Sequence, residues 1–252
     1  MKRLLITTLG ALVALFATAQ SAADHIIDIN GITTHYTVSG PTNGPAAIMI
    51  HGNGGSYHDM AASAQVMAEA GYRVYAIDSR GQGQNAPLPE YHYFDMAEDV
   101  NAFIQALHIH HPVVLGFSDG GIIAIELALL HPENVKAIAT CGANVQPNGI
   151  QPHLFAEFKK KVDEAQRAGK PIPALTKMML IEPTLSPEQL QTITTPALIM
   201  AGENDLITLA HTTHIHQCLK GSTMLILGGE DHGSYVSSGL AARHFLLYLT
   251  TK

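Results

Sequence analysis

The sequence predicts an α/β domain in which a mostly parallel sheet of about eight strands is flanked by helices. Two observations support this prediction. Short, continuous apolar runs alternate with helical patterns along the chain, and continuous apolarity is what a parallel strand buried on both faces requires. In addition, 46% of the 252 residues are apolar and only 14% are charged, which excludes a disordered chain.

The sheet is expected to begin with an antiparallel hairpin, because Asn30-Gly31 suits a type I′ turn between two β-rich runs. The predicted strands are Ile26–Ile29, Ile32–Val38, Ala46–Ile50, Arg73–Ile77, Pro112–Phe117, Val135–Thr140, Ala197–Ala201 and Thr223–Leu227. The helices predicted between most of them are Ser56–Ala70, Phe94–His108, Asp119–Leu130, Leu209–Leu219 and Ser234–Leu249.

One stretch interrupts the alternation of strands and helices. Between residues 142 and 195 no strand pattern is found, and the predicted elements are the helices Leu154–Ala168, Ala174–Ile181 and Pro187–Gln191. We interpret residues 143–194 as a small helical cap inserted after the sixth strand. Because no linker or repeat is found, residues 23–252 are expected to form a single domain.

Residues 1–22 are predicted to be a secretory signal peptide. Lys2 and Arg3 precede an apolar run, Leu4–Ala17, and small residues follow it, with a cleavage site expected within Ala19–Ala23. The run is shorter than the roughly 20 apolar residues that span a bilayer, so no stable membrane span is expected. The protein is therefore expected to be exported, to the periplasm or the medium, with an uncleaved anchor or a buried helix as alternatives.

The charge balance bears on the class of partner. The full chain has 14 basic and 21 acidic residues, and without residues 1–22 the balance becomes 12 minus 21, or −9. An acidic chain is not expected to bind nucleic acid, whose partners are basic. Two cysteines are too few for a disulfide framework. Cys141 and Cys218 are expected on opposite sides of the sheet, too far apart to form a disulfide.

A candidate nucleophile lies where the fifth predicted strand meets the following helix. Residues 116–120 read Gly-Phe-Ser-Asp-Gly, the G-x-S-x-G pattern of a tight strand-to-helix turn that lifts the serine hydroxyl clear of the sheet. The two glycines let strand and helix approach each other, and the Ser118 backbone is expected to be strained. The alternative is a glycine-rich turn without chemistry.

A second loop is expected to complete an oxyanion hole beside Ser118. His51-Gly52-Asn53-Gly54-Gly55 ends the third predicted strand, where this architecture supplies a backbone donor. The N–H groups of Asn53 and Asp119 are expected to stabilise the oxyanion together. His51 is expected to brace the loop by hydrogen bonds, and a plain turn is the alternative.

The serine hydroxyl needs a base, and the base needs an orienting acid. Of fifteen histidines, His232 is the best placed, because it follows the last predicted strand. Asp205 follows the strand before it, at the sheet edge where α/β proteins bind ligands. Glu203 and Asp231 are alternative acids.

These motifs resemble the α/β-hydrolase superfamily, and the stretch 201–234 resembles small microbial serine esterases. The resemblance extends over residues 24–250, and its other motifs are His51-Gly52, Gly116–Gly121 and Asp78–Gly83, a turn expected to be structural. Ser118 departs from the haloalkane dehalogenases and epoxide hydrolases, which have Asp at that position, and the chain has no Trp for their activating pairs.

The resemblance implies a serine hydrolase that cleaves carboxylic esters or related acyl substrates through an acyl-enzyme, with a small-molecule substrate and no cofactor. The same Ser-His-Asp residues could instead serve lactone, thioester or carbon–carbon bond hydrolysis, or perhydrolysis. A non-catalytic binding member of the fold is the remaining alternative. The oligomeric state is not predicted.

Three features of the sequence have no assigned role in this implied serine hydrolase. His211, His214 and His216 are expected on a solvated helix, with metal binding as the alternative; no metal is predicted. Lys159–Lys161 of the cap are expected to be solvated, with recognition of anionic substrates or a membrane surface as the alternative. Met178–Ile181 are expected either to line an acyl pocket or to pack the cap onto the core.

Overall fold

The computed structural model describes residues 23–252. Residues 1–22, on which the predictions of a signal peptide and of export rest, lie outside this part of the chain. Within it, no helix is long and apolar enough to cross a membrane.

The sheet has eight strands in the order β1-β2-β4-β3-β5-β6-β7-β8. Their bounds are β1 Ala23–Ile29, β2 Ile32–Ser39, β3 Ala46–Ile50, β4 Arg73–Ile77, β5 Val113–Phe117, β6 Ala137–Cys141, β7 Ala197–Asn204 and β8 Thr223–Asp231. The β1–β2 and β2–β4 pairs are antiparallel, and all the other pairs are parallel. The predicted fold class is therefore confirmed.

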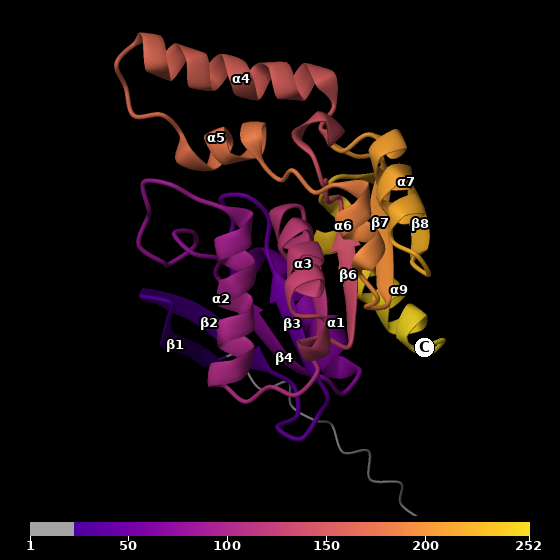
Figure 1. Ribbon diagram of the computed structural model, residues 1–252. Coiled ribbons are helices and arrows are strands. Elements are labelled where there is room, and N and C mark those ends of the chain that lie inside the picture. The colour runs from indigo at the N-terminus through magenta and orange to yellow at the C-terminus, as the bar shows by residue number, and fades with distance from the viewer. Residues whose placement is uncertain (1–22) are drawn as a thin grey trace, which may run out of the picture.

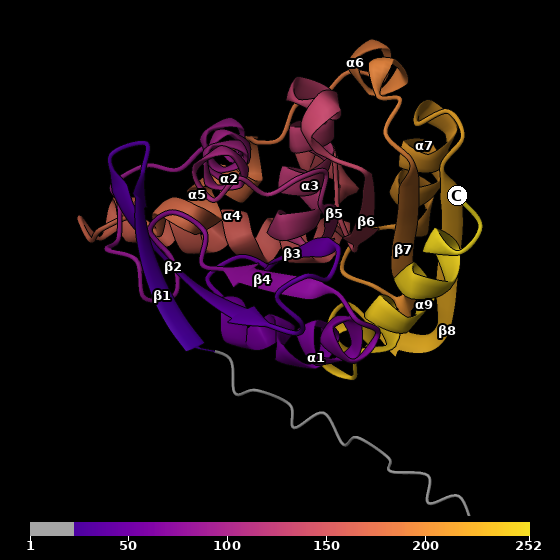
Figure 2. The same cartoon turned by 90° about the horizontal axis from the view of Figure 1, so that it is seen from below.

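Helices cover both faces of the sheet (Figures 1 and 2). Their bounds are α1 Ala61–Glu69, α2 Tyr93–Ala106, α3 Asp119–Leu130, α4 Pro152–Arg167, α5 Ala174–Ile181, α6 Pro187–Thr192, α7 Leu209–Cys218, α8 Ser234–Ser237 and α9 Leu240–Leu249. Residues of α2, α3 and α7 pack on one face, and residues of α1, α8 and α9 pack on the other.

The two cores follow from the two-residue period of the strands. In β3, Ile48 and Ile50 belong to the core under α2 and α3, whereas Ala47 and Met49 belong to the core under α1 and α9. All four are fully buried, as continuous apolar runs in a parallel sheet require. Cys141 and Cys218 also belong to different cores, so the prediction that they lie on opposite sides of the sheet is confirmed.

The prediction of a single helix over Ser234–Leu249 is wrong. Two helices, α8 and α9, occupy this stretch, and Gly239 between them has a φ of 75°. A left-handed residue cannot continue a right-handed helix, and glycine adopts this conformation without a side-chain clash. The break turns the chain so that both short helices pack on the same core.

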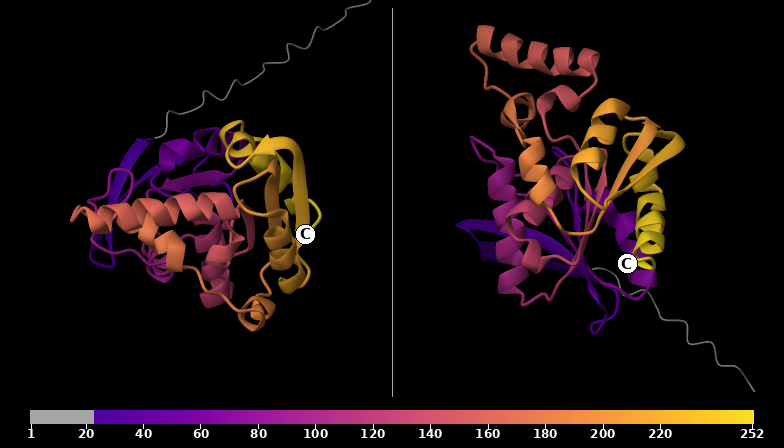
Figure 3. Two further views of the ribbon diagram at one scale, coloured as in Figure 1. Left: turned by 90° about the horizontal axis from the view of Figure 1, so that it is seen from above. Right: turned by 45° about the vertical axis from the view of Figure 1, so that its right-hand side comes forward.

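The segment between β6 and β7 contains α4, α5 and α6, as expected from the missing strand pattern. In Figure 1, α4 and α5 lie beyond the end of the sheet where β6 ends, and Figure 3 shows α4 crossing the molecule when seen from that side. No residue of α4 is fully buried, and Lys159–Lys161 are exposed. An isolated bridge between Ile150 and Ile207 joins the start of the segment to the residues after β7.

Candidate active site

Three strand ends bring the predicted site residues together. Ser118 follows β5, Asp205 follows β7 and His232 follows β8, and β5, β6, β7 and β8 are neighbours in the sheet. Asn204 pairs with Asp231 at the last position of the β7–β8 ladder. Asp205 and His232 are the next residues on these two strands, so they emerge side by side at one edge.

Ser118 occupies the strained turn that the G-x-S-x-G pattern predicts. Its φ and ψ are 52° and −114°, a conformation that costs a non-glycine residue about 1–3 kcal/mol. A Cβ on Gly116 would collide with the backbone of Gly120, and one on Gly120 would collide with the backbone of Ile50. The two glycines therefore allow the close packing of strand and helix that holds Ser118 in this conformation.

His232 connects Ser118 to Asp205. Its Nε2 lies 3.0 Å from the Ser118 hydroxyl oxygen, and its Nδ1 lies 2.6 Å from Asp205 Oδ1. A carboxylate oxygen can only accept, so the proton of the neutral imidazole lies on Nδ1 and Nε2 is free to accept the Ser118 proton. This is the geometry of an activated serine.

Asp205 is fixed more firmly than the two alternative acids. Its side chain is 1% exposed, and its carboxylate accepts hydrogen bonds from the N–H groups of Gly202 and Ile207. Glu203 and Asp231 are exposed; Glu203 accepts from Gly229 N–H, and Asp231 accepts from the two residues that follow His232. Of these three acids, it is Asp205 that contacts the His232 ring.

Two residues next to His232 were missed by the sequence analysis. Gly142, directly after β6, has a φ of 63°, and a Cβ there would lie 2.7 Å from His232 Cε1. Phe117 also packs against His232, with its ring centre 5.0 Å from that of the imidazole. The position of Gly142 after a strand was a usable signal, because such glycines often make room for a neighbouring group.

The predicted oxyanion donors lie on adjacent segments. The Asn53 side chain donates a 2.8 Å hydrogen bond to Asp119 Oδ2, which ties the loop after β3 to the start of α3. Within residues 23–252, the backbone N–H groups of Asn53 and Asp119 donate to no protein acceptor. Both N–H groups are therefore free to donate to an external oxygen.

The side chain of Asp119 forms a network that the sequence analysis did not identify. It is 3% exposed, and besides Asn53 it accepts a 2.8 Å hydrogen bond from the hydroxyl of the fully buried Tyr93. Burial raises the pKa of the Asp119 carboxyl to about 6, although the hydrogen bonds from Asn53 and Tyr93 oppose this rise. Tyr93 lies in α2, far from Asp119 in sequence, so no local pattern indicated this contact.

His51 braces the loop after β3, as expected. Its Nε2 accepts from Ser79 N–H at 3.0 Å, so its Nδ1 carries the proton and donates to Gly52 O at 2.7 Å. Burial lowers the pKa of His51, which favours this neutral form. The Gln82 side-chain oxygen accepts a hydrogen bond from Gly54 N–H, and Arg80 forms an ion pair with Asp99 of α2.

The prediction that the histidines of the helix over residues 209–219 are solvated is wrong for His211. The ring is 9% exposed, and its Nε2 accepts a 3.0 Å hydrogen bond from Val145 N–H. Burial and the nearby His214 lower the pKa of His211 to about 4. His211 therefore ties α7 to the start of the β6–β7 segment. For the metal alternative, residues 23–252 contain no group of three or more His, Cys, Asp or Glu side chains placed to hold a metal ion.

Two cavities lie near the β6–β7 segment. One, of about 520 Å³, is lined by residues at the start of this segment, such as Phe155; the other, of about 400 Å³, lies between α2, α3 and the α5–α6 connection. Ser118, Asp205 and His232 line neither cavity, nor do Met178–Ile181. Met178 packs in the core, which supports the packing alternative for that residue.

The fold and this geometry define an α/β protein with a serine at a tight strand-to-helix turn, hydrogen-bonded to a histidine. The family model described as "alpha/beta hydrolase fold" matches residues 45–179, more than half of the chain. The chain therefore belongs to the alpha/beta hydrolase fold family.

Comparison with known proteins gives three similarities of different extent. Bifunctional epoxide hydrolase 2 of Rattus norvegicus is 32% identical over 46% of this chain and 21% of its own length. Serine hydrolase BPHL of Mus musculus is 24% identical over 89% of this chain and 84% of its own. The structure of carboxylesterase CesB from Bacillus subtilis superposes with a TM-score of 0.76 at 18% identity, over 92% of this chain and 93% of that one. The chain spans about a fifth of the length of the rat and pig epoxide hydrolases.

Proposed function

We propose that this protein is a serine hydrolase that cleaves carboxylic esters through a covalent acyl-enzyme. The observation that carries the proposal is the continuous hydrogen-bond chain from Ser118 through His232 to Asp205, with distances of 3.0 and 2.6 Å. Such a chain makes a serine hydroxyl nucleophilic at neutral pH. No step of this chemistry requires a metal or a cofactor.

In the first half of the proposed reaction, Ser118 Oγ attacks the ester carbonyl carbon while His232 Nε2 takes the hydroxyl proton. The carbonyl oxygen becomes an oxyanion that accepts hydrogen bonds from the N–H groups of Asn53 and Asp119. The carbon–oxygen bond to the alcohol then breaks, and His232 returns the proton to the departing alkoxide. Asp205 holds the tautomer and stabilises the imidazolium that forms between these steps.

In the second half, water replaces the alcohol. His232 removes a proton from the water as it attacks the acyl carbon, and the collapse of the second oxyanion returns the proton to Ser118 Oγ. The carboxylic acid leaves, and the site is restored. The strained Ser118 backbone and the buried Asp205 keep the reacting groups aligned throughout, which reduces the entropic part of the barrier.

Two comparisons favour an ester over an epoxide as the substrate. A relative that aligns over most of both chains is called a serine hydrolase, and a structural neighbour of similar length is a carboxylesterase. The epoxide hydrolases match less than half of this chain, and the attacking residue of that class is expected to be Asp, where this chain has Ser118. These names support the choice of substrate class, and the site geometry supports the mechanism.

We further propose that residues 143–194 act as a cap that selects the acyl or alcohol group. The segment follows β6, next to the strand that carries Ser118, and α4 and α5 lie beyond the same end of the sheet (Figure 3). Insertions at this edge are where α/β proteins vary their specificity.

The experiment is a panel of p-nitrophenyl esters of increasing acyl length, measured beside lactones. Wild-type protein is expected to hydrolyse at least one ester, and Ser118→Ala to lower kcat by roughly 10³-fold or more while the circular dichroism spectrum stays unchanged. Ser238→Ala is the matched control, because Ser238 is exposed and lies outside the site. Turnover of Ser118→Ala close to that of wild type would contradict the mechanism, and turnover of lactones alone would contradict the substrate class.

A further inference from the structure

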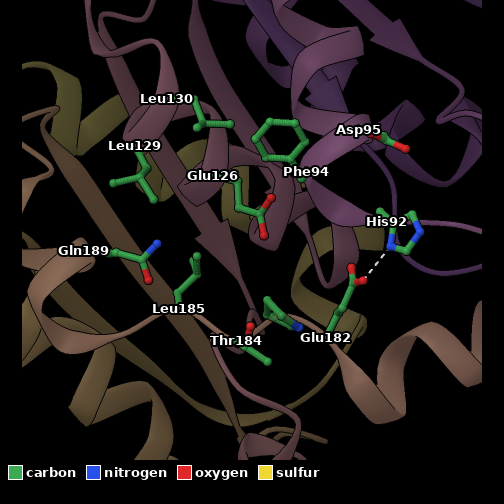
Figure 4. A pocket seen from close by; sticks show the side chains of 11 residues that line it. His92, Phe94, Asp95, Glu126, Leu129, Leu130, Glu182, Thr184, Leu185 and Gln189 are labelled. Carbon is green, nitrogen blue, oxygen red and sulfur yellow. Dashed lines mark hydrogen bonds and ion pairs between the residues drawn. The ribbon is translucent and has the colours of Figure 1, made fainter.

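The cavity of about 400 Å³ between α2, α3 and the α5–α6 connection is separate from Ser118, His232 and Asp205. Figure 4 shows it from close by, with the carboxylates of Glu126 and Glu182 directed into the same space. Its apolar wall includes Phe94, Leu129 and Leu185. We call this space the α2–α3 cavity.

The acidic groups of the α2–α3 cavity differ in whether they have a partner. Glu182 accepts from the His92 ring at 2.6 Å and from Tyr93 N–H at 3.2 Å. Asp95 forms a 3.2 Å ion pair with Arg80. The negative charges of these two carboxylates are therefore stabilised by groups of the protein itself.

The Glu126 carboxylate has no such hydrogen-bond donor or cation beside it in the part of the chain that the structure describes. It lies in the middle of α3, a helix whose other buried residues beyond the first turn are apolar, and it is only 7% exposed. Within residues 23–252, no side chain or backbone N–H donates a hydrogen bond to its carboxylate, and no cation lies within ion-pair distance. Its oxygens are not among the fully enclosed side-chain atoms that lack a partner; they face the α2–α3 cavity, where they are accessible to a cation from outside the chain.

The chemistry of the wall limits what that partner can be. A metal ion needs several ligating side chains, and residues 23–252 contain no group of three or more placed to hold one. One free carboxylate beside apolar side chains instead matches a single positive charge on a short hydrocarbon, since the charge pairs with Glu126 while the hydrocarbon contacts Leu129 and Leu185.

We propose that the α2–α3 cavity binds the ammonium group of a small alkylamine, with Glu126 as its counter-ion. The cavity volume is of the size that small-molecule sites occupy. Burial, with the nearby Glu182, raises the pKa of the Glu126 carboxyl to about 7. Binding of a cation is therefore coupled to loss of the Glu126 proton.

The test uses n-pentylammonium and its neutral analogue 1-pentanol, titrated by calorimetry into the full-length protein at about pH 8. The expected result is that pentylammonium binds and that 1-pentanol binds at least about tenfold more weakly, because it lacks the charge. Glu126→Gln keeps the shape of the side chain and is expected to weaken pentylammonium at least about tenfold. Glu157→Gln, at an exposed position of α4 outside the cavity, is the matched control and is expected to bind as wild type does.

A second measurement keeps the test independent of how well Glu126→Gln folds. The other titratable groups that line the cavity are His92, directly before α2, Asp95 of α2, and Glu182, directly after α5. Between about pH 6 and about pH 8 Glu126 ionises, so the affinity of wild-type protein for pentylammonium is expected to rise roughly fivefold or more.

Three outcomes would overturn the proposal. They are equal affinity for pentylammonium and 1-pentanol, undiminished binding in a folded Glu126→Gln variant, and an affinity for pentylammonium that falls or stays constant as the pH rises. Ester hydrolysis by Glu126→Gln is expected to equal that of wild type, because Glu126 touches none of the proposed catalytic groups. A failure of the binding test therefore leaves the proposed hydrolase mechanism unaffected.

Discussion

Helix α3 carries two buried acids in very different surroundings. Asp119, at its first turn, accepts hydrogen bonds from Asn53 and Tyr93, whereas Glu126, about two turns further on, has no hydrogen-bond partner within residues 23–252. The first acid ties three segments of the candidate active site together. The second lines the α2–α3 cavity, which we propose to be an ammonium site.

The pKa values of the two acids express the same difference. Burial is the largest cause of the rise in both cases, to about 6 for Asp119 and about 7 for Glu126. For Asp119 the rise is opposed by two hydrogen bonds that stabilise the ionised form, whereas for Glu126 it is increased by the negative charge of Glu182. The two acids thus differ in whether groups of the protein stabilise their ionised form.

The largest effect is predicted at Asp205, the most fully partnered acid of the site. Asp205→Asn retains the shape but no longer fixes the proton on His232 Nδ1, so kcat for the best ester is expected to fall roughly 10³–10⁴-fold. Glu203→Gln, two residues away and exposed, is expected to change kcat less than about threefold. Steady-state kinetics of both variants would contradict the assignment if Glu203→Gln lost more activity than Asp205→Asn.

A smaller effect, on stability instead of kcat, is predicted at Glu126, where the substitution is expected to stabilise the folded protein. Because burial and Glu182 raise its pKa from 4.5 to about 7, its ionisation destabilises the folded state fully above about pH 7 and not at all below about pH 4.5. Glu126→Gln removes this cost and is expected to raise the free energy of unfolding by about 3 kcal/mol at pH 8, and by little near pH 4.5.

Urea denaturation at the two pH values, without added amine, measures this difference. Glu157→Gln serves again as the control, since its carboxylate is exposed and contributes no comparable pH dependence. A Glu126→Gln variant that is less stable than wild type at pH 8 would mean that Glu126 already has a partner within the protein.

The smallest effect, again on the free energy of unfolding, is predicted for removing a hydrogen bond to Asp119. Tyr93→Phe removes one of the two hydrogen bonds to the carboxylate and is expected to lower the free energy of unfolding by about 1 kcal/mol. The loss is expected to be larger above about pH 6, where Asp119 is ionised, than below it. Tyr248→Phe is the matched control, because that buried hydroxyl has no hydrogen-bond partner within residues 23–252; equal destabilisation of the two variants would contradict the role given to Tyr93.

The sequence predicted the sheet well because buried parallel strands are continuous apolar runs with little ambiguity. The bounds of β3 and β4 agree residue for residue, and so do those of α3 and α5. The positions of Ser118, His232 and Asp205 followed from a simple rule, that parallel strands deliver the residues after them to one edge. The extension of β7 and β8 by a few residues was missed, because polar residues in that stretch obscure the strand pattern.

The parts that the sequence did not reveal depend on contacts between distant segments. His211 has the polar neighbours of a solvated helix, yet it is buried because α7 packs on Val145. The bond from Tyr93 to Asp119 and the cavity beside Glu126 arise only when α2 and α3 lie together. Side-chain periodicity reports which face of an element is apolar, and it does not report which polar group of another element meets it.

The central claim is that Ser118 is a nucleophile activated by His232 and Asp205, and covalent labelling tests it most directly. Wild-type protein is incubated with a fluorophosphonate, digested, and the modified residue is located by mass spectrometry. The predicted result is one label per chain, on Ser118, with none on Ser118→Ala and slow labelling of Asp205→Asn. Absence of label on Ser118 in a preparation that hydrolyses esters would contradict the claim.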